Sequence, residues 1–100
     1  MRLDDLLAGL DTLDMHEVFP DMEVTAVTCD SRKVAPGSIF VAVPGTRSDG
    51  HEYITDALKA GATLVVQSKP LERTVSGSFL RVSDSREMYA LLATRLAGLG

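Results

Sequence analysis

Residues 39–66 read IFVAVPGTRSDGHEYITDALKAGATLVV, and this stretch decides the fold. It opens with an apolar run over 39–43, which is typical of a strand buried on both faces. Apolar residues at helical spacing then predict a helix over about 51–60, and Gly61 is expected to end it. A second apolar strand is predicted over 62–66. A strand, a helix and a strand at this spacing form a βαβ unit, in which the two strands run parallel.

The flanking sequence extends this unit on both sides. A short amphipathic helix is predicted over 2–10, where leucines recur at helical spacing, and an irregular acidic segment over 11–23. Further strands are predicted over 24–29 and 79–82, and a final helix after Asp84, which has a glutamate at capping-box spacing. The fold class is therefore α/β: a small layered domain with a mixed, partly parallel sheet of about four strands and three helices.

The composition is that of one globular domain and argues against several classes of protein. Of 100 residues, 45% are hydrophobic and 24% charged, which is enough for one modest core. The net charge of −4 and the lack of a basic face argue against binding of nucleic acid. No apolar run approaches the roughly 20 residues of a membrane span, and early aspartates are atypical of a signal peptide. We therefore expect a cytoplasmic protein without membrane insertion.

Few residues offer metal or nucleophilic chemistry. Cys29 is the single cysteine, so an intrachain disulfide is excluded. His16 and His51 are the two histidines, and neither has a cysteine or carboxylate partner at metal-ligand spacing. No serine or threonine stands beside a usual base. From the residues alone, we expect neither a metal site nor catalysis.

The loop between the first strand and the helix of the βαβ unit offers groups that suit an anion. Gly45 and Gly50 are spaced as in a phosphate-binding loop, but His51-Glu52 stand where that loop has Lys and Ser or Thr. A triphosphate site of that kind is therefore excluded. The residues between the glycines still supply two hydroxyls and one arginine ahead of a helix N-terminus, which stabilises anions. Two interpretations stay open: a ligand-binding loop, or a surface loop whose Asp49 caps the helix.

A longer motif surrounds this loop and resembles a known family. Its blocks are Asp30-Ser31-Arg32-Lys33-Val34, Pro36-Gly37, Phe40-Val41-Ala42, Pro44-Gly45, Asp49-Gly50-His51, Ala57 and Gly61-Ala62. Together they resemble the N-terminal domain of the Mur ligases. Residues 1–7 and the run Pro44-Gly45-Thr46 resemble the MurE group of that family more than the MurF group. The resemblance covers about the whole chain.

The resemblance implies a function and a domain organisation. Residues 1–100 would be a single UDP-substrate-binding domain of an ATP-dependent ligase of peptidoglycan synthesis, which binds the UDP part of UDP-MurNAc-L-Ala-D-Glu. The full-length enzyme would add a diamino acid, meso-diaminopimelate by family frequency. ATP and Mg²⁺ would be held by a central ligase domain outside this chain, and a C-terminal domain would select the amino acid. No cofactor is expected in these 100 residues, and the fragment alone is expected to be inactive.

The resemblance also assigns roles to individual residues. By position, the contacts to the UDP part fall on Cys29, Ser31, Thr46, Arg47 and Ser48. His51 is a further candidate, as a donor to a phosphate. Asp30 and Arg32 are instead expected to fix the turn by hydrogen bonds and an ion pair. Two alternatives remain at this stage: the equivalent domain of MurF, which adds D-alanyl-D-alanine, and a free-standing interaction module of the same fold.

Overall fold

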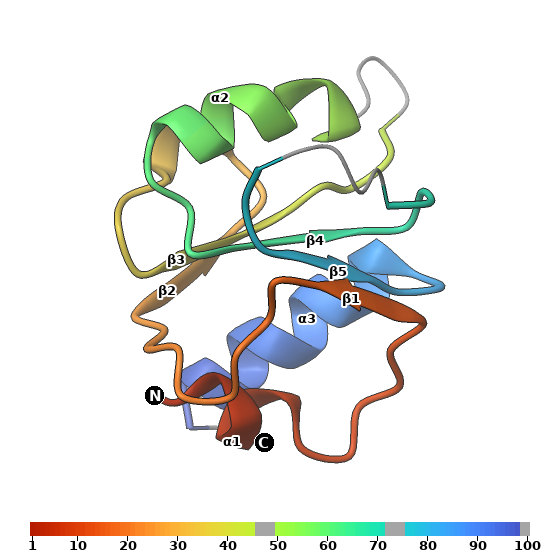
Figure 1. Cartoon of the computed structure of the whole chain (residues 1–100). Coiled ribbons are helices and arrows are strands. Elements are labelled where there is room, and N and C mark those ends of the chain that lie inside the picture. Colours follow the sequence, from red (N-terminus) through yellow and green to blue (C-terminus); the bar gives the residue numbers. More distant parts are fainter. Residues whose placement is uncertain (46–49, 72–75, 99–100) are drawn as a thin grey trace.

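A five-stranded mixed sheet forms the middle layer of the protein, with its strands in the order β1-β5-β4-β3-β2 (Figure 1). The structure is a computed structural model that describes residues 1–45, 50–71 and 76–98. The parallel strands are β2 (Ala26–Thr28), β3 (Ser38–Val41), β4 (Leu64–Gln67) and β5 (Phe79–Arg81). The remaining strand, β1 (Asp14–His16), pairs with β5 in the antiparallel sense. The carboxyl ends of the four parallel strands therefore meet at one end of the sheet.

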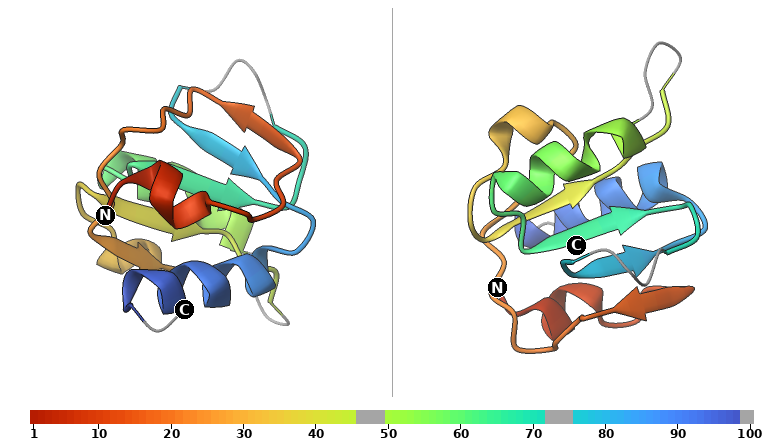
Figure 2. Two further views of the ribbon diagram at one scale, coloured as in Figure 1. Left: turned by 90° about the horizontal axis from the view of Figure 1, so that it is seen from below. Right: turned by 45° about the horizontal axis from the view of Figure 1, so that its top comes forward.

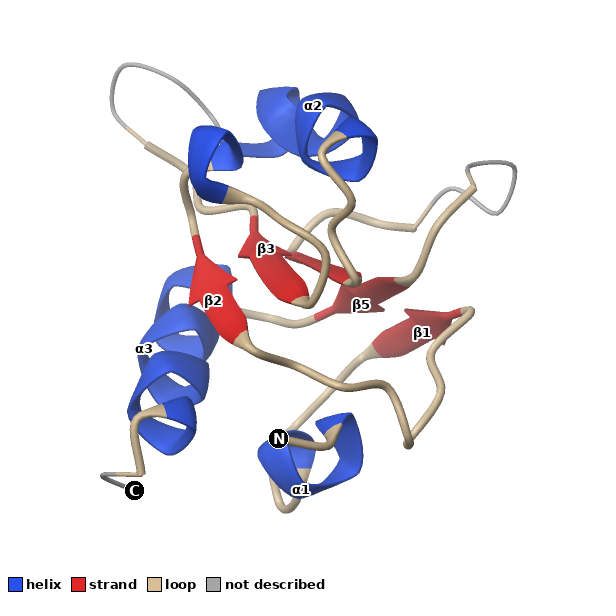
Figure 3. Ribbon diagram, turned by 90° about the vertical axis from the view of Figure 1, so that its left-hand side faces the viewer, coloured by secondary structure: helices blue, strands red, loops and turns tan. Residues whose placement is uncertain are grey.

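Helices cover both faces of this sheet (Figure 2). One face carries α1 (Leu3–Leu7) and α3 (Ser85–Leu96), and the other carries α2 (Ile54–Lys59), as the side view of Figure 3 shows. Two 3-10 turns complete the α2 side: η1 (Ser31–Lys33) follows β2, and η2 (Gly50–Tyr53) leads directly into α2. The predicted layered α/β domain with a mixed sheet is confirmed.

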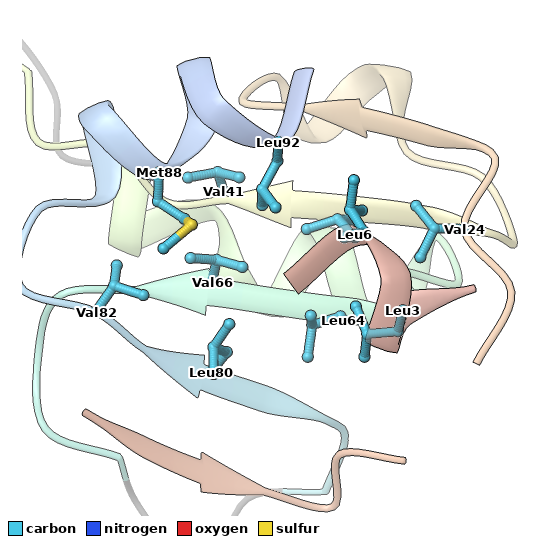
Figure 4. Close-up of a cluster of buried hydrophobic side chains, with 11 residues drawn as sticks. Leu3, Leu6, Val24, Val41, Leu64, Val66, Leu80, Val82, Met88 and Leu92 are labelled. Atoms are coloured by element: carbon cyan, nitrogen blue, oxygen red, sulfur yellow. The ribbon is translucent and has the colours of Figure 1, made fainter. Parts of the chain in front are cut away.

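Neighbouring residues of the central strands point into two different cores. Ile39, Val41 and Val66 belong to the core shared with α1 and α3, which Figure 4 shows in part. Phe40 and Val65 lie on the opposite face, in a smaller core shared with α2. Side chains alternate along a strand, so a sheet covered on both faces needs apolar residues at every position. That requirement explains the uninterrupted apolar runs on which the βαβ prediction rests.

The N-terminal segment departs from the prediction in two places. Residues 11–23 were expected to be irregular, yet they contain β1, so the sheet has five strands rather than about four. Backbone pairing with β5, in the register Met15–Leu80, makes this a strand, although its one apolar side chain, Met15, is 46% exposed. The first helix is shorter than the predicted 2–10, because Gly9 adopts a left-handed φ of +76°.

The final helix begins after Asp84, as predicted, and buries one of its sides. The Asp84 side chain caps α3 by accepting a hydrogen bond from the Glu87 N–H at 3.0 Å. Met88 and Leu92 are buried in the larger core, whereas Leu91 is 38% exposed. Leu91 lies outside this core, because the sheet packs against the side of α3 on which Met88 and Leu92 lie. No helix within the described ranges is long and apolar enough to cross a bilayer.

Candidate functional site

The turn that follows β2 is fixed by one arginine and one aspartate. The Asp30 carboxylate accepts hydrogen bonds from the Arg32 Nε and Nη2 at 3.1 and 3.0 Å, and another from the Arg32 backbone N–H at 3.0 Å. These bonds from Arg32 hold the pKa of the Asp30 carboxyl below its usual value, and Asp30 in turn raises the pKa of Arg32. The predicted structural role of this pair is confirmed. Its effect is to hold Ser31 at the start of η1.

An open cleft of about 640 Å³ lies between this turn and the start of α2. We call it the Cys29 cleft; its lining residues are Cys29, Asp30, Ser31, Arg32, Tyr53 and Asp56. Cys29 is exposed, and within the described residues the Ser31 hydroxyl has no hydrogen-bond partner. The structure thus brings together two of the residues that the sequence predicted as UDP contacts, at the carboxyl end of β2.

Tyr53 and Asp56 are two cleft residues that the sequence analysis missed. Tyr53 is 40% exposed, so part of its ring is available to a flat ligand. Asp56 lies three positions further along the chain, and residues at this spacing share one face of a helix. That spacing is the one signal that could have grouped them. Nothing in the sequence indicates that this face would lie opposite Ser31.

Gly50, at the start of η2, packs against the segment that follows β3. The Gly50 N–H donates to the Val43 carbonyl at 3.0 Å, and a Cβ at position 50 would lie 2.6 Å from the Val43 backbone nitrogen. Glycine is therefore required here by the close approach of two backbone segments. The predicted UDP contacts Thr46, Arg47 and Ser48, and the predicted cap Asp49, lie outside the described residues. Their roles stay predictions.

The structure places His51 away from the Cys29 cleft. His51 lines a different cleft, of about 350 Å³, together with residues of α2 and of the segment after β4. Its Nε2 accepts a hydrogen bond from the backbone N–H of Ser68 at 3.3 Å. A ring nitrogen that accepts this bond carries no proton to donate, so a phosphate would have to meet the other ring nitrogen. The role of His51 as a phosphate contact stays a prediction.

The residues of this chain do not fit ATP with its magnesium ion. The glycine pair around the loop lacks the lysine and hydroxyl residue that a triphosphate site needs, since His51-Glu52 occupy those positions. Among the described residues, no three His, Cys, Asp or Glu side chains gather as a metal site would require. We therefore derive no chemical step through ATP or Mg²⁺ on this chain.

Comparison with known proteins identifies the family. The model of the family described as "Mur ligase family, catalytic domain" matches residues 23–96, which is most of the chain. The chain belongs to the Mur ligase family. The resemblance noted in the sequence is confirmed.

Relatives of this Mur ligase chain include diaminopimelate ligases. It is 46% identical over 77 residues to the UDP-N-acetylmuramoyl-L-alanyl-D-glutamate–2,6-diaminopimelate ligase of Agrobacterium fabrum, covering 77% of this chain and 15% of the relative. With the enzyme of the same name from Oceanobacillus iheyensis it shares 35% identity over 95 residues, covering 95% of this chain and 19% of the relative. The chain thus spans about a fifth, or less, of the curated relatives that it matches.

Solved structures share the fold of this Mur ligase chain. MurF from Acinetobacter baumannii superposes with a TM-score of 0.76 at 23% identity, over 91% of this chain and 20% of that one. MurF from Thermotoga maritima, solved in complex with ADP, gives a TM-score of 0.64 at 31% identity, over 80% of this chain and 18% of that one. The A. baumannii likeness bears on the fold alone.

Proposed function

We propose that this chain is the N-terminal, UDP-binding domain of a cytoplasmic ligase that adds meso-diaminopimelate to UDP-MurNAc-L-Ala-D-Glu. The observation that carries the proposal is the Cys29 cleft, which Ser31 and Tyr53 both line. A hydroxyl and an aromatic face are groups that recognise a nucleoside. The similarity to diaminopimelate ligases favours that activity over the activity of MurF, whose solved structures support the fold.

The proposed domain binds and orients substrate and leaves the chemistry to the rest of the enzyme. The central domain would hold ATP, which would supply the phosphoryl group that activates the substrate carboxylate. On this chain, the Ser31 hydroxyl would hydrogen-bond the uridine, and Tyr53 would cover one face of the base. Asp30 and Arg32 neutralise each other through their ion pair, so this pair adds little net charge beside a diphosphate. The positive charge for the diphosphate would come from Arg47, by position.

The test is a titration of the 100-residue chain with uridine, UDP and ADP, followed by NMR amide shifts. We expect uridine and UDP to shift the amides of residues 29–32 and 53–56, whereas ADP at equal concentration shifts them much less. Ser31→Ala should weaken UDP binding about two- to tenfold, the effect of one hydroxyl hydrogen bond. Ser76→Ala is the matched control, since Ser76 is an exposed serine outside the cleft, and it should leave binding unchanged. Equal shifts with ADP and UDP would refute base recognition here.

A further inference from the structure

A separate small cleft lies where α3 begins. It has a volume of about 200 Å³, and we call it the α3 cleft; its lining residues are Pro44, Ser68, Ser83, Asp84, Ser85 and Arg86. These residues follow the carboxyl ends of β3, β4 and β5. Because these strands are parallel neighbours, the residues lie together at one end of the sheet. Ligands of open parallel sheets bind outside the carboxyl ends of strands. The α3 cleft shares no residue with the Cys29 cleft.

Ser85 in this cleft has a buried hydroxyl without a partner. The residue is 2% exposed, and its Oγ forms no hydrogen bond within the part of the chain that the structure describes. Buried hydroxyls are nearly always hydrogen-bonded, because leaving one unsatisfied is unfavourable. A ligand atom in the α3 cleft would supply the missing partner.

The backbone at the start of α3 supplies further donors to the same place. The Asp84 carboxylate accepts a hydrogen bond from the backbone N–H of Glu87, the third residue of the helix. The N–H groups of Ser85 and Arg86, the first two residues, have no acceptor among the described residues. N–H groups at the start of a helix of 12 residues carry the positive end of its dipole and bind anions.

Arg86 adds a full positive charge at the rim of the cleft. Its Nη2 donates to the Pro44 carbonyl at 2.6 Å, which holds the guanidinium between α3 and the chain that leaves β3. The other N–H groups of this side chain are available to a ligand. The hydroxyls of Ser68 and Ser83 also line the cleft. Among the described residues that line the cleft, the one opposing group is the Asp84 carboxylate, which lowers the affinity for any anion.

We propose that the α3 cleft binds a single phosphate group, held by Ser85, Arg86 and the first N–H groups of α3. The number of converging donors and the small volume suit a tetrahedral oxyanion rather than a nucleobase. The phosphate could be free inorganic phosphate or one phosphate of a nucleotide diphosphate. The inference rests on the α3 cleft alone and stands independently of the nucleoside site proposed above.

The experiment titrates the chain with sodium phosphate at constant ionic strength and follows the amide signals of Ser85 and Arg86 by NMR. We expect saturable shifts of these two signals, with sodium chloride as the control that leaves them in place. A second titration adds UDP to the phosphate-saturated protein. If UDP competes with phosphate, the group bound in the cleft belongs to the nucleotide; if both bind together, the cleft holds free phosphate.

Two conservative variants separate binding from folding. Ser85→Ala removes the unpartnered hydroxyl and should weaken phosphate binding about two- to tenfold. Asp84→Asn keeps a capping oxygen but removes the opposing charge, so it should tighten phosphate binding while α3 stays capped. Thermal unfolding and NMR dispersion check that each variant is folded. Absence of saturable shifts, or identical phosphate affinity in the wild type and both variants, would overturn the proposal.

Discussion

The two faces of the sheet bury hydrophobic cores of different size. The face against α1 and α3 buries eleven residues in one cluster, and the face against α2 buries six. The Cys29 cleft lies entirely on the weaker face, between η1 and α2. The stronger face therefore carries most of the stability, while the thinner α2 layer presents the residues proposed to bind the nucleoside. Function placed on the less heavily packed layer is typical of sites that must adjust to a substrate.

Removal of a large side chain from the stronger face should give the largest effect. Leu92 is fully buried between α3 and the sheet. Leu92→Ala should lower the free energy of unfolding by about 2–5 kcal/mol, because it removes apolar contacts and leaves a cavity. Urea unfolding followed by circular dichroism measures the change. A loss below about 1 kcal/mol would show that α3 contributes little to the core.

Two adjacent valines of β4 allow the two faces of the sheet to be tested separately. Val66 faces α3 and Val65 faces α2, and both are fully buried. Each change to alanine should cost about 1–3 kcal/mol of stability. Only Val65→Ala should also weaken UDP binding, because Val65 supports the layer that forms the Cys29 cleft. Calorimetry on folded protein measures the UDP affinity of the two variants. An equal loss in both would contradict the claim that only the α2 face supports the Cys29 cleft.

Gly50 tests how tightly the α2 layer is tied to β3. Gly50→Ala places a Cβ against the Val43 backbone, which cannot move aside as a flexible side chain would. We expect a loss of about 1–3 kcal/mol in stability, the usual effect of overpacking, with NMR shifts concentrated in η2 and α2. Gly98→Ala is a matched control for the added methyl, since nothing lies within 4 Å of a Cβ there, although its positive φ adds some strain. NMR shifts spread evenly over both faces of the sheet would show that Gly50 does not act specifically on the α2 layer.

The smallest effect concerns the pH dependence of the turn after β2. Hydrogen bonds from Arg32 lower the pKa of Asp30 in the folded protein below 3.8. A carboxyl with a lowered folded-state pKa stabilises the fold above its unfolded pKa, and this contribution is lost as the pH falls through the folded value. Asp30→Asn should therefore lower stability slightly near neutral pH and reduce its decline below about pH 4. Melting temperatures of both proteins across the acid range provide the measurement, and parallel curves would refute it.

The sequence predicted the parts of the site that are formed by residues close together in the chain. Asp30 and Arg32 are two residues apart, so their ion pair follows from one turn of chain. Ser31 and Cys29 lie beside that pair, and their proximity needed no tertiary information. His51 is different, because its hydrogen bond joins it to Ser68, 17 positions away in sequence. No periodicity or spacing could indicate that contact.

By itself, the sequence determined the βαβ unit, the capped start of α3 and the turn after β2. Those features depend on side-chain periodicity, on cap residues and on neighbours in the chain, all of which act within a few residues. Tertiary structure alone decided three others: that Asp14–His16 is a strand, that Tyr53 lines one cleft with Ser31, and that the buried Ser85 hydroxyl has no partner among the described residues. The reason is physical. A short polar segment becomes a strand only where a neighbouring strand offers its backbone, and a cleft exists only where packed layers bring distant residues together.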